Sequence, residues 1–149
     1  MTPQADLAEP TRVTWDADFA AGHELIDAQH QGLFDQCNRL ADLCTGGAGE
    51  VSLRQFDQAF DRLKVLAREH CESEAALLAA SGQALAEPED ALAECEEFEY
   101  LADEIATTAN FDRLELQRFL ALWCVGHVKA SARQLREALA THLLAAAQR

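Results

Sequence analysis

Apolar residues recur at alternating steps of four and three along four stretches of this 149-residue chain, a spacing that places them on one face of a helix. The first stretch spans 22–44 and is closed by a glycine-rich break. The second begins at Ser52, which forms a capping-box pattern with Gln55, and fades at Ser81. Each stretch has one apolar face to bury, so we expect the helices to pack against one another.

Two further helices are predicted in the second half of the chain. Pro88 suits a first helical turn and opens the third helix, while Asp112 and Glu115 repeat the capping-box pattern at the start of the fourth. Short turns make successive helices antiparallel neighbours. The sequence therefore predicts one all-α domain over the whole chain, an antiparallel up-down-up-down four-helix bundle over about 22–146. Residues 1–20 are expected to form an extended N-terminal arm that docks on it.

Composition excludes several classes of partner. Acidic residues outnumber basic ones 26 to 12, and a net charge of −14 repels phosphate backbones and anionic lipid heads. We therefore expect no nucleic acid and no membrane surface as partner. The chain also has no apolar run approaching the roughly 18 residues of a membrane span and no visible secretory signal, which favours a cytoplasmic protein. Its five cysteines, without a CxxC pair, are expected to be reduced.

Polar residues interrupt the apolar faces at one level of the predicted bundle. Glu74 follows His70 by one turn on the second helix, although burying a carboxylate is costly unless it is paired or binds a metal. Residue counts from the connecting turns put His30, His70, Cys95 and His127 within about one helical turn of the same height. Singly, each histidine is most simply a hydrogen-bonded core residue. Together with a carboxylate, they are typical ligands of zinc and non-haem iron.

Three motifs carry a resemblance to a known family. One surrounds the start of the first helix: Trp15, Phe19, Gly22, Ile26-Asp27-x-Gln29-His30, Leu33 and Asn38. The other two lie on the second and fourth helices: His70-x-x-x-Glu74-x-x-Leu77-Leu78 and Phe119-Leu120-x-x-Trp123-x-x-x-His127-Val128. Across most of residues 13–135 the chain resembles the bacterial hemerythrins, the hemerythrin-like (HHE) metal-binding family. The resemblance implies a four-helix bundle that holds two irons through five histidines, a bridging glutamate and a bridging aspartate, and that binds oxygen.

The chain departs from that pattern at the positions that complete the two-iron centre. One alignment of the third helix puts Ala91 and Cys95 where the family has histidines, and an ungapped count puts Glu89 and Ala93 there. The bridging aspartate falls on Ala132 in an apolar stripe. Three of the seven ligands that the resemblance implies are therefore absent, so we expect no two-iron oxygen carrier.

The remaining residues favour a single metal ion. The resemblance implies that His30 and His70 are ligands of one iron, that Glu74 is the former bridge and that His127 belonged to the other iron. Cys95 is a candidate fifth ligand. Iron is expected, with zinc as the other choice, and an open position on iron would bind a small diatomic ligand such as oxygen or nitric oxide. The alternative is a metal-free bundle retained as an interaction or regulatory module.

Large apolar residues are expected to enclose this site. Trp123 lies one turn before His127 and is expected to pack over it, with Ile26 and Phe98 completing the pocket. No nucleophilic triad or phosphate-binding glycine loop is visible, so the pattern favours a binding protein over an enzyme.

Overall fold

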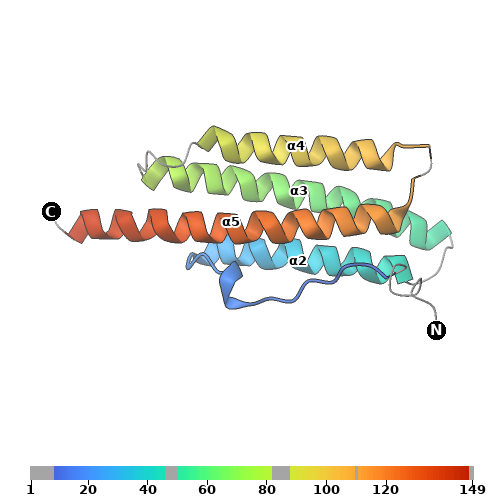
Figure 1. Ribbon diagram of the computed structural model, residues 1–149, viewed down its shortest axis with the longest axis horizontal. Coiled ribbons are helices and arrows are strands. Elements are labelled where there is room, and N and C mark those ends of the chain that lie inside the picture. Colours follow the sequence, from blue (N-terminus) through green and yellow to red (C-terminus); the bar gives the residue numbers. More distant parts are fainter. Residues whose placement is uncertain (1–8, 46–49, 82–87, 110, 148–149) are drawn as a thin grey trace.

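The computed structural model describes residues 9–45, 50–81, 88–109 and 111–147. Its elements are a short 3-10 helix and four α-helices: η1 (Ala17–Phe19), α2 (Glu24–Thr45), α3 (Glu50–Ser81), α4 (Pro88–Ala106) and α5 (Arg113–Ala147). The four long helices run side by side and alternate in direction (Figure 1), and the described residues contain no strand. The predicted all-α four-helix bundle is confirmed. None of the helices in the described part combines the length and apolarity that crossing a bilayer demands.

The helices begin within two residues of the caps that the sequence predicts. Gly22 precedes α2 with a φ of 79°, a left-handed conformation that favours glycine. The Asp112 carboxylate accepts a hydrogen bond from the Leu114 backbone N–H at 2.9 Å and so caps α5. α3 begins at Glu50, two residues before the predicted cap at Ser52.

The described part of the N-terminal arm lies along α2 and α5 in an extended path (Figure 1). The Val13 backbone N–H donates to the Asn38 amide oxygen at 2.8 Å, and the Asn38 amide group donates to the Val13 carbonyl at 2.9 Å. Thr11 makes the same pair of contacts with the Gln117 side chain. The arm is therefore pinned to two helices by side-chain amides, and its residues before Glu9 lie outside the described part.

Two hydrophobic clusters fill the bundle. The larger, the aromatic cluster, includes the buried residues Phe19, Leu33, Phe34, Leu40, Phe56, Phe60, Leu63, Phe98, Leu116 and Leu120. The smaller, the small-residue cluster, comprises Ala21, Ile26, Leu78, Ala132, Leu135 and Ala138. Between their positions along the helices lies a buried polar layer, made of His30, His70, Glu74, His127 and Ser131. This layer is the candidate functional site.

Candidate metal centre

Three helices bring the four predicted ligands into one layer. α2 supplies His30, α3 supplies His70 and Glu74 one turn apart, and α5 supplies His127. All four are at most 5% exposed. The His30 and His70 rings are 4.7 Å apart between centroids, and the His70 and His127 rings 5.2 Å. The heights along the bundle that residue counts from the turns predicted for these histidines therefore agree with the structure.

The Glu74 carboxylate lies between two of the histidines. Its Oε2 is 3.3 Å from Nε2 of His70 and 3.3 Å from Nε2 of His127. This Oε2 atom is buried and has no hydrogen-bond partner of suitable geometry among the described residues. Donor atoms of these three residues all lie within 4.8 Å of one another. Two nitrogen or oxygen ligands on a tetrahedral zinc ion are about 3.3 Å apart, given zinc–ligand distances of about 2.0–2.1 Å. The spacing therefore matches that of atoms sharing one metal ion.

Residues that contact the Nδ1 atom of a histidine, which we call its outer partners, fix the orientation of two rings. His70 Nδ1 lies 3.2 Å from Gln29 Oε1, and the Gln29 amide nitrogen donates to the Ser73 hydroxyl, which leaves Oε1 to accept from His70. His127 Nδ1 lies 3.0 Å from the Glu94 carboxylate. Because both acceptors hold a proton on Nδ1, it is the Nε2 atoms of the two rings that face Glu74. Metal-binding histidines are held in this way.

His30 has the same arrangement. Its Nδ1–H donates to the Phe19 carbonyl at 2.9 Å, while its Nε2 is buried with no partner among the described residues. Burial, reinforced by the neighbouring His70, lowers the pKa of His30 to about 4, so the ring is neutral. An unpaired nitrogen in the core costs about 1–3 kcal/mol unless a ligand satisfies it. His30 Nε2 lies outside the compact group of His70, Glu74 and His127.

The charges of the layer form one buried ion pair. Burial opposes ionisation of Glu74, but the nearby nitrogens of His127 and His70 outweigh it and lower the pKa of Glu74 to about 2. Burial likewise opposes protonation of His127, but Glu74 and Glu94 raise its pKa to about 9. Burial lowers the pKa of His70. Without metal, the layer thus holds a protonated His127 beside an ionised Glu74.

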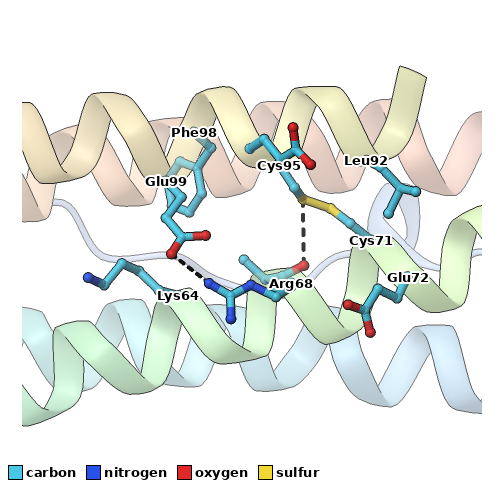
Figure 2. Close-up of a pocket in the computed structure, with 10 residues that line it drawn as sticks. Lys64, Arg68, Cys71, Glu72, Leu92, Cys95, Phe98 and Glu99 are labelled. Atoms are coloured by element: carbon cyan, nitrogen blue, oxygen red, sulfur yellow. Dashed lines mark hydrogen bonds and ion pairs between the residues drawn. A yellow bond between two sulfur atoms is a disulfide. The ribbon is translucent and has the colours of Figure 1, made fainter. Parts of the chain in front are cut away.

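Cys95 does not join this group as a thiolate. It forms a disulfide with Cys71, which ties α4 to α3 across a Cα–Cα distance of 6.5 Å (Figure 2). The expectation that all five cysteines are reduced is wrong for this pair. Cys71 follows His70 by one residue. Because one residue along a helix rotates the side chain by about 100°, Cys71 faces α4 at the height of Cys95. Its sulfur lies 4.0 Å from His127 Nε2.

The positions that lack family ligands are apolar or covalently occupied. Ala132 is fully buried in the small-residue cluster. On α4, Cys95 is buried whereas Ala93 is exposed. Only the alignment through Ala91 and Cys95 therefore has its second position inside the bundle, and the side chains of Ala91 and Glu89 lie outside the described part.

Aromatic rings cover His127 from one side. Trp123 stacks on the His127 ring at 4.7 Å and 7°, and Phe98 stacks on Trp123 at 3.8 Å and 17°. Ile26 is fully buried in the small-residue cluster. Trp123 thus packs directly on His127, and Phe98 packs on Trp123.

Four residues at the site were not among the predicted site residues. Gln29 and Glu94 hold the histidine rings, Cys71 approaches His127, and the buried Ser131 hydroxyl lies 3.5 Å from His70 Nε2. A signal existed for one of them. Counting residues from the turn between the second and third helices puts Cys71 at the same height as Cys95, closer than His70.

The donor set fits a single metal ion, because an unpaired imidazole nitrogen and an unbonded carboxylate oxygen remain buried in one layer. Comparison with known families agrees with this chemistry. The family model described as the hemerythrin HHE cation binding domain matches residues 21–145. Searches of curated proteins and of solved structures return no match. The matched region covers most of the chain, which therefore belongs to the hemerythrin HHE cation-binding domain family.

Proposed function

We propose that the protein binds one non-haem metal ion, iron or zinc, through His70, Glu74 and His127, with His30 as the fourth ligand. One observation carries the proposal. Glu74 Oε2 lies 3.3 Å from two imidazole nitrogens yet accepts no hydrogen bond from a described residue, and the third imidazole nitrogen, on His30, is also unpartnered. A metal ion would satisfy the facing atoms of His70, Glu74 and His127 at once, and a shift of His30 toward them would bring its Nε2 to the same ion.

A single ion is favoured over a pair. A second iron would need ligands from α4 and from the turn of α5 that follows His127. Ala132 offers no donor atom there, and Cys95 is tied to Cys71. The chain is accordingly not proposed to carry oxygen on a two-iron centre.

The site is proposed to bind or sense a small oxidant or diatomic ligand such as oxygen or nitric oxide. When bound, iron would supply an open coordination position for such a ligand. The protein contributes the surroundings. Trp123 keeps water from one side of His127, and the small-residue cluster around Ala132 lies next to the layer. With zinc in the same ligands, the site would be structural.

The metal-free alternative has an observation in its favour. The ion pair of protonated His127 with Glu74 and Glu94 already balances the buried charge without a cation. On this alternative, the bundle is an interaction or regulatory module. The two functions differ in their response to chelators, because a metal bound only by the folded chain must stabilise it.

Metal analysis of wild type, His70→Ala and His23→Ala tests the proposal. The proteins are loaded with iron(II) without air or with zinc, dialysed and analysed by elemental methods and thermal unfolding. We expect one metal per chain in wild type and His23→Ala, little in His70→Ala, and a lower melting temperature after chelation. Equal, negligible metal in all three proteins, with no response to chelator, would establish the metal-free module instead.

A further inference from the structure

The Cys71–Cys95 disulfide lies against the candidate metal centre. Figure 2 shows it bridging α4 and α3, with Leu92 beside it. Cys71 Sγ is 4.0 Å from His127 Nε2, one of the nitrogens that face Glu74. Of the five cysteines, Cys37, Cys44 and Cys124 are free. Reduction or oxidation of this pair would therefore change the immediate surroundings of the ligand His127.

Each sulfur of the pair already has a partner suited to its reduced form. Cys95 Sγ lies 3.5 Å from the Ala67 carbonyl, which would accept a hydrogen bond from its thiol (Figure 2). A sulfur and a nitrogen bound to the same tetrahedral zinc are about 3.5 Å apart, given bond lengths of about 2.3 and 2.0 Å. The 4.0 Å separation of Cys71 Sγ and His127 Nε2 is close to this value. Reduction thus needs only a small movement of Cys71 to place its sulfur on a shared ion.

A cavity gives access to the pair from outside the bundle. Its volume is about 260 Å³, and both cysteines line it together with Ala67, Leu92 and Phe98. Cys95 is 7% exposed and Cys71 only 1%. Cys95 is therefore the more accessible of the two residues to a small thiol in the cavity.

We propose that Cys71 is a reserve metal ligand, freed when a small thiol reduces the disulfide; the inference rests on the proposed single-ion site. A thiolate attacks the Cys95 sulfur, the Cys71–Cys95 bond breaks, and Cys71 leaves with the bonding electron pair. A second thiol then displaces the first from Cys95, so that two thiols are oxidised to one disulfide while two protein thiols form. Cys71 then joins His70, Glu74 and His127 and gives up its proton to solvent on binding.

The consequence is a metal site whose ligand set depends on the redox state. In the oxidised protein the layer offers no thiolate donor. In the reduced protein it gains one thiolate, a ligand that zinc and iron both accept. Reducing conditions therefore tighten metal binding, and oxidation loosens it.

Two substitutions separate this proposal from a purely structural disulfide. Cys71→Ser and Cys95→Ser both abolish the disulfide, but only Cys95→Ser leaves the Cys71 sulfur. The probe is cobalt(II), whose thiolate complexes show a charge-transfer absorption band that imidazole and carboxylate complexes lack. Samples of the full chain are titrated oxidised and after reduction with a phosphine, which adds no sulfur ligand.

We expect the band in reduced wild type and in Cys95→Ser, and its absence in oxidised wild type and in Cys71→Ser. We expect cobalt to bind at least about tenfold more tightly where the band is present, since even loss of an outer partner of a ligand costs that much. Cys44→Ser, which leaves the pair intact, should behave as wild type. Reduced wild type tests the same point if a variant fails to fold.

A band in Cys71→Ser, or its absence in reduced wild type, would overturn the proposal. If oxidised wild type binds cobalt and reduction changes neither band nor affinity, only the reserve ligand is wrong. If neither form binds cobalt, the proposed single-ion site fails as well. The two failures are thereby distinguishable.

Discussion

The two sides of the polar layer differ in how completely they are built for a metal. On the side of α2, α3 and α5, the Nε2 atoms of His70 and His127 lie 3.3 Å from the Glu74 carboxylate. His30 Nε2 is buried in the same layer without a partner among the described residues, and the Nδ1 atom of each of the three rings contacts an oxygen. On the side of α4 and the following turn of α5, Cys95 is tied to Cys71 and Ala132 is packed in an apolar cluster. On this second, incomplete side, neither Cys95 nor Ala132 offers a free polar atom to a metal. On the first, complete side, each histidine keeps the oxygen that contacts its Nδ1 atom.

Substitution of Glu74 should have the largest effect on stability and metal binding, because this carboxylate lies between His70 and His127 on the complete side. Glu74→Gln keeps the shape but leaves His127 charged beside a neutral amide. Breaking a buried pair in this way costs about 4 kcal/mol. We expect the metal-free variant to lose that much free energy of unfolding in denaturant titrations and metal binding to fall by about 100-fold or more. Glu72→Gln, an exposed change on the same helix, is the control and should alter neither quantity. A variant as stable as this control would show that Glu74 is not paired in the core.

Placing a carboxylate on the incomplete side probes the other half of the comparison. Ala132→Asp inserts a carboxyl group into the small-residue cluster, at a position that is fully buried. We expect the metal-free variant to lose about 3 kcal/mol, since the group has no partner there. Added iron(II) or zinc should restore part of the loss, because position 132 lies next to the polar layer.

The matched control for that experiment is Ala130→Asp, which adds the same charge at an exposed position of α5. Thermal unfolding with and without metal is measured for both variants. A loss in Ala132→Asp that metal leaves unchanged would mean that position 132 does not face the ion, and the two sides would then be separate in space.

The pH dependence of stability isolates the unpaired nitrogen of His30. Folding lowers the pKa of this base from its ordinary 6.5 to about 4, mainly through burial. As pH falls, the unfolded chain takes up the proton first, so stability present above pH 6.5 is lost between pH 6.5 and 4. For the metal-free protein we expect a loss on the order of 2 kcal/mol over this window.

His30→Gln should flatten this loss, while His23→Gln should retain it. Denaturant titrations at several pH values, with chelator present, provide the comparison. His70, whose pKa burial also lowers, contributes in the same direction and leaves a residual slope. Identical pH profiles for the His30→Gln variant and wild type would show that His30 is not buried neutral.

Periodicity explains why much of this layer could be predicted from the sequence. Helical seams repeat every 3.6 residues, so His30, His70, Glu74 and His127 stand out as polar residues on apolar faces, and residue counts give their level. Contacts between helices need finer information. One residue rotates a side chain by about 100°, and this rotation turns Cys71 toward Cys95 rather than toward the seam.

Outer partners are harder still to predict. Gln29 is adjacent to His30 in sequence but holds His70 on another helix. Glu94 is a half-exposed acid among many, and only the bundle shows that it faces His127. Such residues have no pattern of their own, because long polar side chains at helix edges reach their partners through the angle between helices rather than through a repeat.

Glu94 gives the smallest effect and the sharpest test of whether outer partners belong to the complete side. Its carboxylate lies 3.0 Å from His127 Nδ1, and its side chain is 51% exposed. Removing an outer partner of a metal ligand typically weakens binding by about 10- to 100-fold. Because water can partly replace this exposed carboxylate, we expect Glu94→Ala to weaken metal binding by about tenfold, measured by competition with a chelator. Glu97→Ala, an exposed change on the same helix, should bind as wild type. Equal affinities for the two variants would mean that His127 keeps its orientation through Trp123 stacking and Glu74 alone, and that α4 contributes nothing to the complete side.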